Sequence, residues 1–306
     1  MPSTSYSANP ALTSYAKLIA PDLTKGAADF IAPSVQVPAT LGHYKAYNDK
    51  QAFQNYDTRR GVGGKAKRML VDSTDPTYNC EANSLEYAID DIQRAQAGVG
   101  DPLGQEKAGI QALLSNAAIS HEKQVFDTIA SGVSAVGGVG VWSNNSNNPI
   151  TELNAQIEAL ATLTGRMPNR ILFGLTAFRI YTGNTNVLSY FPGAPVITVD
   201  SMTEKGLLIN PEIEMKVAHM PFDSNKMGKA ASKSQIAGSE VYIFFASSAP
   251  NLLDPSFAKT FRGGEGGVTQ VRQYRDEGVR SDVFAVDWSV DIQITSSISA
   301  KRITVS

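Results

Sequence analysis

Cysteine, histidine and charge are all scarce in this sequence. One cysteine, Cys80, among 306 residues excludes an internal disulfide and implies no oxidising compartment. The three histidines have no HxH, HExxH or CxxC partner, so we expect no metal site. Charged residues make up 18% of the chain, below the roughly 25% typical of soluble domains. The net charge of -2 argues against a dedicated nucleic-acid binder, which would carry a strong positive field.

Long apolar runs are also missing. No run approaches the roughly 18 apolar residues of a membrane span. Residues 1–21 have no apolar core long enough for a signal peptide. We therefore expect a soluble protein that folds in the cytoplasm and has no membrane partner.

The sequence lacks the motifs of common enzyme classes. It has no GxSxG, no GxxxxGK[ST] and no strand–GxGxxG–helix arrangement, and the glycine clusters at 137–140 and 263–267 lack the residues of a phosphate cradle. The pair Asp90 and Asp91 could bind a cation, but a solvated turn is the favoured interpretation. His121 lies on an apolar helix stripe and is expected in the core, and Cys80 is expected to be a structural thiol. The sequence thus predicts no catalytic residue, no cofactor and no enzymatic activity.

The first eighty residues are polar, although they contain short ordered patterns. Residues 1–24 form an arm without sustained periodicity, and residues 43–78 are rich in Lys, Arg, Asp, Asn and Gly. Such composition is typical of disorder or of a surface loop, because it cannot build a core. We expect arm and loop to be held by other copies of the chain, and the loop to be an extended hairpin with a flexible tip.

A basic run in this loop is the one concentrated charge feature. It comprises Arg59, Arg60, Lys65, Lys67 and Arg68. Three interpretations remain open: a non-specific phosphate contact, a contact with the acidic surface of a neighbouring subunit, and a solvated loop tip. In the arm, the apolar side chains of Tyr15 and Leu18 are further candidates for contact with a neighbouring subunit.

A long helix is predicted from 101 to 131. Asp101 suits the N-cap, Pro102 suits the first helical position, and Gly132 follows the last turn. One apolar stripe runs along it at three- and four-residue spacing. About thirty residues at roughly 1.5 Å each give a rod of roughly 45 Å, long for a globular domain.

The pattern changes to mixed α/β after this helix. Asn148 and Pro149 begin a second helix that Gly165 ends. Strands are predicted at 170–173, 195–199 and 240–245, with a short helix at 176–182. The stretch 268–305 contains long β-branched or alternating runs.

Several segments have a recognisable order. Residues 30–37 lead from the arm into the loop, 78–91 lead out of it, 167–174 and 193–199 open the mixed α/β region, and 271–277 begin a late β return. In their order these segments resemble the tailed-bacteriophage major capsid proteins of the Hong-Kong-97-type fold. No single segment is specific to this family, so the resemblance rests on all of the segments together and on their order.

The resemblance implies an α+β fold with a mixed α/β axial domain and a peripheral domain built on a spine helix at 101–131. The expected boundaries are an N-terminal arm at 1–42, an extended loop at 43–80, the peripheral domain at 81–150, the axial domain at 151–249 and a return to the peripheral domain at 250–306.

The resemblance also implies a structural role. The chain would assemble with itself into pentamers and hexamers of an icosahedral virion shell, built in the host cytoplasm around double-stranded DNA that it contacts non-specifically. A portal, a separate scaffolding protein and a decoration protein would be its partners. We expect no removable scaffold segment, and no Lys–Asn crosslink, because nothing identifies an acceptor for Lys65 or Lys67. An encapsulin-type compartment is the alternative, and a small-molecule enzyme built on the mixed α/β region is a remote one.

Overall fold

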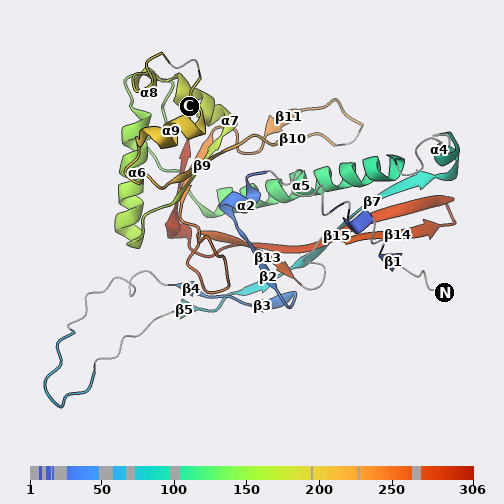
Figure 1. Ribbon diagram of the computed structural model, residues 1–306, viewed down its shortest axis with the longest axis horizontal. Coiled ribbons are helices and arrows are strands. Elements are labelled where there is room, and N and C mark those ends of the chain that lie inside the picture. The colour runs from blue at the N-terminus through green and yellow to red at the C-terminus, as the bar shows by residue number, and fades with distance from the viewer. Residues whose placement is uncertain are drawn as a thin grey trace.

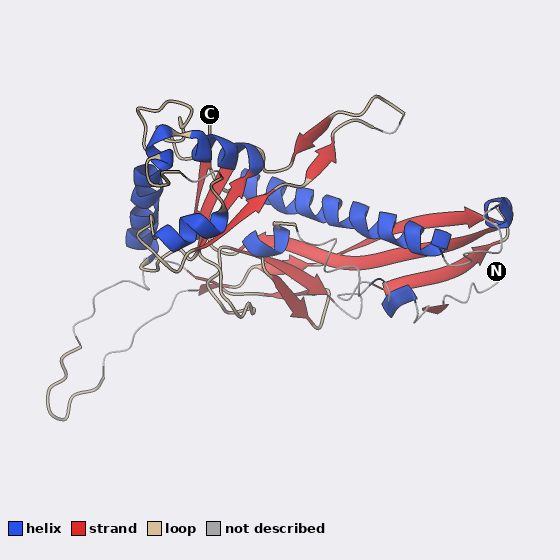
Figure 2. Ribbon diagram, turned by 45° about the horizontal axis from the view of Figure 1, so that its top comes forward, coloured by secondary structure: helices blue, strands red, loops and turns tan. Residues whose placement is uncertain are grey.

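The computed structural model describes residues 7–8, 12–14, 16, 26–47, 58–66, 73–96, 104–193, 196–226, 228–263 and 270–306. The molecule is elongated: an α/β module lies at one end, and a long helix runs from it along a β-sheet (Figure 1). An extended loop leaves the body near the same end, on the far side of the sheet from the helix (Figure 2). No helix among the described residues is long and apolar enough to cross a membrane.

The long helix is α5, Gly104–Gly132, and its 29 residues confirm the predicted spine. Its apolar stripe, which includes Ile110, Leu113, Val125 and Ile129, is buried. The helix packs on strands β15 and β7 of the sheet below it. The expected N-cap, Asp101, lies outside the described residues.

The sheet under α5 is organised around β15, Ser281–Ile294. β7 (Glu81–Asp90) pairs antiparallel along one edge of β15, and β14 (Gln270–Asp276) and β13 (Ala258–Gly263) pair antiparallel along the other. β2 (Ser34–Val37) adds parallel to β13. The β-rich end of the sequence was predicted, but β7 was not, because its apolar residues do not alternate strictly with polar ones and its partner lies about 200 residues away in the chain.

The described part of the arm lies on its own chain. β1 (Ser7–Ala8) pairs antiparallel with β14. Leu12 and Ala16 are buried in the core between α5 and the sheet. These residues make intramolecular contacts that the sequence analysis did not predict, whereas the expected contact with a neighbouring copy stays a prediction. Tyr15 and Leu18 lie outside the described residues.

The α/β module has a sheet in the order β16-β12-β8-β9. Its strands are β8 (Arg170–Gly174), β9 (Glu214–Ala218), β12 (Glu240–Phe244) and β16 (Ala300–Thr304), and its helices are α6 (Pro149–Thr164), α7 (Leu175–Gly183), α8 (Thr185–Leu188) and α9 (Val199–Lys205). The predicted start and end of α6 are confirmed: the Asn148 side chain accepts from the backbone N–H of Ile150, and Gly165 adopts a left-handed conformation.

The predicted strand at 195–199 is wrong where the structure describes it. Residues 196–198 are in no strand, and Val199 begins α9. The reason is local. Thr198 and Ser201 form a capping box, in which each side chain accepts from the other residue's backbone N–H, and this starts a helix.

Several short elements complete the fold. The root of the extended loop is made of the pairs β3 (Leu41–His43) with β6 (Thr77–Asn79) and β4 (Ala46–Tyr47) with β5 (Ser73–Thr74). Residues 58–66 of the loop are in no strand, so the expected long hairpin is seen only at its root. The remaining elements are α2 (Ala28–Ile31), α4 (Asp91–Gln96), the 3-10 turn η2 (Ser297–Ser299), and a projecting hairpin of β10 (Pro221–Asp223) and β11 (Lys233–Gln235).

Candidate assembly surfaces

The root of the extended loop is rigidly packed. The ring of Tyr78 stacks on Phe261 with 4.9 Å between centroids, and Tyr44 lies 5.2 Å from the same ring. The Cys80 thiol donates to the backbone oxygen of Phe261, and burial raises its pKa to about 11. The thiol is therefore neutral at physiological pH, which agrees with the structural role predicted for it.

An open groove of about 990 Å³ lies between this root and residues 250–254. Beside it, the fully buried ammonium of Lys259 lies 2.9 Å from a carboxylate oxygen of Asp254 and donates to the backbone oxygen of the same residue. Burial lowers the pKa of Lys259. Burial would raise the pKa of Asp254, but hydrogen bonds from Ser256, Asn251 and Lys259 bring it below its ordinary value. The pair fixes the segment that forms one wall of the groove.

The tip of the extended loop is fully exposed. Arg59, Arg60 and Lys65 lie together on the described tip, as does the apolar side chain of Val62. A turn closed by a 3.0 Å hydrogen bond from Gly64 N–H to the Gly61 oxygen shapes it, with Gly63 at φ +77°. The tip projects away from the body of its own chain (Figure 1). Lys67 and Arg68 lie outside the described residues.

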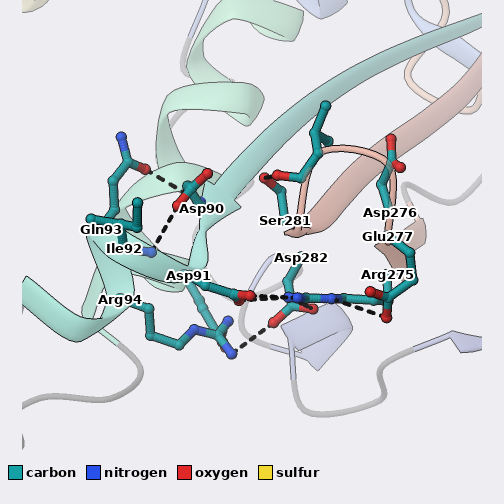
Figure 3. A network of polar contacts seen from close by, with 12 residues as sticks. Asp90, Asp91, Ile92, Gln93, Arg94, Arg275, Asp276, Glu277, Ser281 and Asp282 are labelled. Atoms are coloured by element: carbon teal, nitrogen blue, oxygen red, sulfur yellow. Dashed lines mark hydrogen bonds and ion pairs between the residues drawn. The ribbon is translucent and has the colours of Figure 1, made fainter.

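A second charged surface lies at the opposite end of the molecule, where β7 meets α4 (Figure 3). Arg275 on β14 donates to both carboxylate oxygens of Asp91, at 2.7 and 2.6 Å. Arg94 bridges Asp282 at 2.7 Å and Glu106 at 3.0 Å. The hydrogen bonds from Arg275 lower the pKa of Asp91. The network ties β14, β15, α4 and the start of α5 together.

This network corrects the interpretation of Asp90 and Asp91. Asp91 is exposed, as the solvated interpretation expected, but it is the first residue of α4 rather than part of a turn, and its carboxylate is paired with Arg275. One Asp90 oxygen accepts from the backbone N–H of Ile92, 2.7 Å away. Sequence reasoning missed the pairing, because Arg275 is 184 residues from Asp91.

Helix α2, at the entry to the loop, is fixed by residues from three parts of the chain. The buried carboxylate of Glu122 on α5 accepts from the backbone N–H of Ala27 at 2.9 Å. Lys216 on β9 donates to the Gly26 oxygen at 2.8 Å, and Arg170 donates to the Phe30 oxygen at 3.0 Å. Burial raises the pKa of Glu122, although the backbone hydrogen bonds oppose this. The only signal in the sequence was an acidic residue beside the apolar stripe of a helix.

His121 was expected in the core and is partly buried on α5. Its two ring nitrogens are buried and have no hydrogen-bond partner among the described residues. Burial and the nearby Arg262 lower its pKa to about 4, against a smaller opposing effect of Asp29. The imidazole is therefore neutral at physiological pH and packs as an apolar ring.

Within the described ranges, no group of three or more His, Cys, Asp or Glu side chains could hold a metal ion. The charged groups brought together by the fold are paired with each other in ion pairs and caps. These pairs and caps fix the positions of the elements that they join.

No family model matches the chain. One curated relative, the major capsid protein of Burkholderia phage BcepMu, is 24% identical over 184 residues, which are 57% of this chain and 58% of the relative. The matched part is thus less than two thirds of that protein.

Solved structures match over nearly the whole chain. A phage-related protein from Bordetella bronchiseptica is similar with a TM-score of 0.73, 19% identity and 98% of both chains covered. A virus-like particle from Pyrococcus furiosus gives 0.56, with 11% identity over 94% of this chain and 96% of the other. The mature capsid of bacteriophage PhiM1 gives 0.52, with 10% identity over 89% and 85%. The chain therefore has the Hong-Kong-97-type capsid fold, and the family that its sequence resembles is that of the tailed-phage major capsid proteins.

Proposed function

We propose that this chain is the major capsid subunit of a tailed phage, and that it assembles with itself into pentamers and hexamers of an icosahedral shell around double-stranded DNA. The α/β module would be the axial domain, and α5 with its sheet the peripheral domain. A portal, a separate scaffolding protein and a decoration protein would complete the assembly in the host cytoplasm.

The observation that carries this proposal is the contrast within the extended loop. Its root is packed on Phe261 and pinned by an ion pair between Lys45 and Asp75. Its tip exposes Val62, Arg60 and Lys65 away from the body of its own chain. A rigid root with an exposed tip suits a contact with another copy, because little conformational entropy remains to be lost at the root on binding.

Such a contact is head-to-tail, since the tip of one copy meets a different surface of the next. Heterologous contacts of this kind form rings when the rotation closes. The basic tip would select an acidic surface on the neighbour, and charge complementarity would set the register of the contact.

The direct test is negative-stain electron microscopy of the expressed full-length chain, in which we expect shells or capsomer rings. Deleting residues 55–68 should leave folded subunits without closed shells. A control that replaces 55–68 with a Gly/Ser segment of equal length separates loss of the side chains from loss of length. Normal shells from both variants would contradict the role of the loop, and a wild-type chain that stays monomeric would contradict the proposed function.

An encapsulin-type compartment is the second candidate, favoured by the similarity to the virus-like particle from Pyrococcus furiosus. The two candidates differ in what the shell encloses. Nuclease-protected DNA in native particles would support the phage capsid, whereas an enclosed protein cargo without DNA would support the compartment.

A further inference from the structure

The β10–β11 hairpin is a second projection whose charge the assembly proposal leaves unexplained. Both views place it on the side of α5 that faces away from the β15 sheet, whereas the extended loop leaves on the opposite side (Figures 1 and 2). Its base is anchored to α5, because the Lys123 ammonium lies 5.0 Å from the ring centroid of Phe222. The hairpin therefore has a fixed position on the outer side of the long helix.

The tip of the hairpin is held by its own hydrogen bonds. One carboxylate oxygen of Asp223 accepts from the backbone N–H groups of Asn225 and Ser232, at 2.9 and 3.0 Å. The Asn225 amide donates to the Ala230 oxygen at 2.6 Å, and Gly228 takes the left-handed conformation that the turn requires, with φ +88°. The tip is thus pre-organised without any partner.

This ordered tip is basic. Lys226, Lys229 and Lys233 are exposed, and Asp223 is the only acidic residue between positions 221 and 235. Lys233 faces Asp223 and lowers the pKa of that carboxyl, together with the two backbone hydrogen bonds, which are the larger effect. Lys226 and Lys229 have no ion-pair partner among the described residues and leave a local excess of positive charge.

The neighbouring face of α5 adds almost no negative charge. Of the three acidic residues of α5, Glu106 and Glu122 are buried, and Asp127 is paired with Lys123. Exposed positions of α5 include the amide and hydroxyl side chains of Gln111, Asn116 and Ser120. A polyanion could approach along this face without meeting an unpaired carboxylate.

We propose that the β10–β11 hairpin and the outer face of α5 form the surface that faces nucleic acid, with Lys226 and Lys229 contacting backbone phosphates of double-stranded DNA. The inference rests on the proposed function and names the site of the DNA contact. Contact through a few lysines is sequence-independent and weak, which suits packed DNA that must later leave. It also places the DNA contact on the opposite side of the molecule from the basic run of the extended loop, which remains available to a neighbouring subunit.

The test compares three full-length proteins: the wild type, K226Q/K229Q, and R60Q/K65Q, which removes the same charge from the opposite side. Binding of the unassembled chain to a short mixed-sequence DNA duplex is followed by fluorescence anisotropy between about 50 and 200 mM salt. The slope of log K against log salt is negative, and each lost phosphate contact reduces its magnitude by about 0.9. K226Q/K229Q should therefore reduce this magnitude by about 2, and R60Q/K65Q should leave it unchanged. Shell formation is scored separately by electron microscopy.

Each outcome decides the inference. A smaller slope magnitude for K226Q/K229Q, with the wild-type slope for R60Q/K65Q, supports it. A smaller slope magnitude for R60Q/K65Q alone would assign the DNA contact to the loop and overturn it, as would the absence of DNA binding by the wild type. Lost shell formation by K226Q/K229Q with unchanged DNA binding would make the hairpin a subunit contact. Failure of the wild type to form shells would instead contradict the proposed function, whatever the slopes.

Discussion

The α/β module and the extended loop differ in how far their apolar side chains are buried within a single copy of the chain. In the module, Trp142, Phe173, Tyr181 and Ile243 are fully buried against each other and their neighbours. At the described tip of the loop, Val62 is fully exposed between two glycines, and the charged side chains of Arg60 and Lys65 are exposed as well. The module completes its own core, whereas the loop leaves its contacts to be made elsewhere.

This difference separates residues that stabilise the fold from residues that are available for binding another copy. Burial of apolar area stabilises the module within a single copy, at about 25 cal/mol per Å². The loop tip contributes almost nothing to that stability, so its side chains are available for binding. Variants should therefore divide into those that unfold the chain and those that only prevent its association.

The largest effect is expected for Phe173→Ala in the module. Phe173 is fully buried and packs edge-on against Phe178 at 5.7 Å. The cavity should lower the free energy of unfolding by about 3–5 kcal/mol, measured by urea denaturation. Val62→Ala at the loop tip is the control and should change it by less than about 0.5 kcal/mol. If the two variants lost the same free energy of unfolding, the module would not be the part of the chain that stabilises the fold.

A pH effect is expected at the junction between α5 and the start of the loop. His121 has a pKa of about 4 in the folded chain and an ordinary value of 6.5. Between these values the unfolded state binds the proton first, so stability falls as the pH drops from 7 to 4. The loss due to this group is up to about 3 kcal/mol.

The His121→Leu variant isolates this contribution. Carboxylates whose pKa is lowered by hydrogen bonds, such as Asp91, also lose stability on acidification, but they do so in both proteins. The difference in unfolding free energy between variant and wild type should therefore change across pH 7 to 4. A constant difference would mean that His121 titrates normally in the folded chain.

A smaller loss is expected for Asn148→Ala, which removes the cap of α6 in the module. The Asn148 oxygen accepts from the Ile150 N–H at 3.0 Å, and loss of such a cap costs about 1 kcal/mol. Asn116→Ala on the exposed face of α5 is the control and should cost nothing, because alanine favours a helix interior. Thermal unfolding of both variants checks this, and equal shifts in Tm would show that the cap has no specific role.

The smallest effect on stability is expected for R60Q/K65Q at the loop tip. Both side chains are exposed, so the unfolding free energy should stay within about 0.5 kcal/mol of the wild type. Shell yield should nevertheless fall, because two charges of the contact are lost. The fall should become steeper as salt is raised, because salt screens the charges that remain at the contact. Unchanged yield at every salt concentration would leave the tip with no role in assembly.

How much the sequence predicted depended on the range of the interactions. The spine helix and α6 were found because apolar spacing, Asn148, Pro149 and Gly165 are local signals, and α6 has the predicted cap residues at both ends. Strand β7 was missed because its apolar and polar residues do not alternate strictly, so only its pairing with β15 identifies it as a strand. The predicted strand at 195–199 failed because the capping box of Thr198 and Ser201 is stronger than the apolar alternation around it.

The sequence by itself determined helices α5 and α6, the caps of α6, the α+β class and a loop too polar to form a core. These features depend on residues within about four positions of each other, where the backbone has few choices. Only the tertiary structure decided that Glu122 accepts from the Ala27 N–H at the start of α2, that Asp91 pairs with Arg275, and that β1 adds to β14. Each of these contacts joins residues about a hundred or more positions apart, and local propensity carries no information about which distant partner the fold brings within hydrogen-bonding distance.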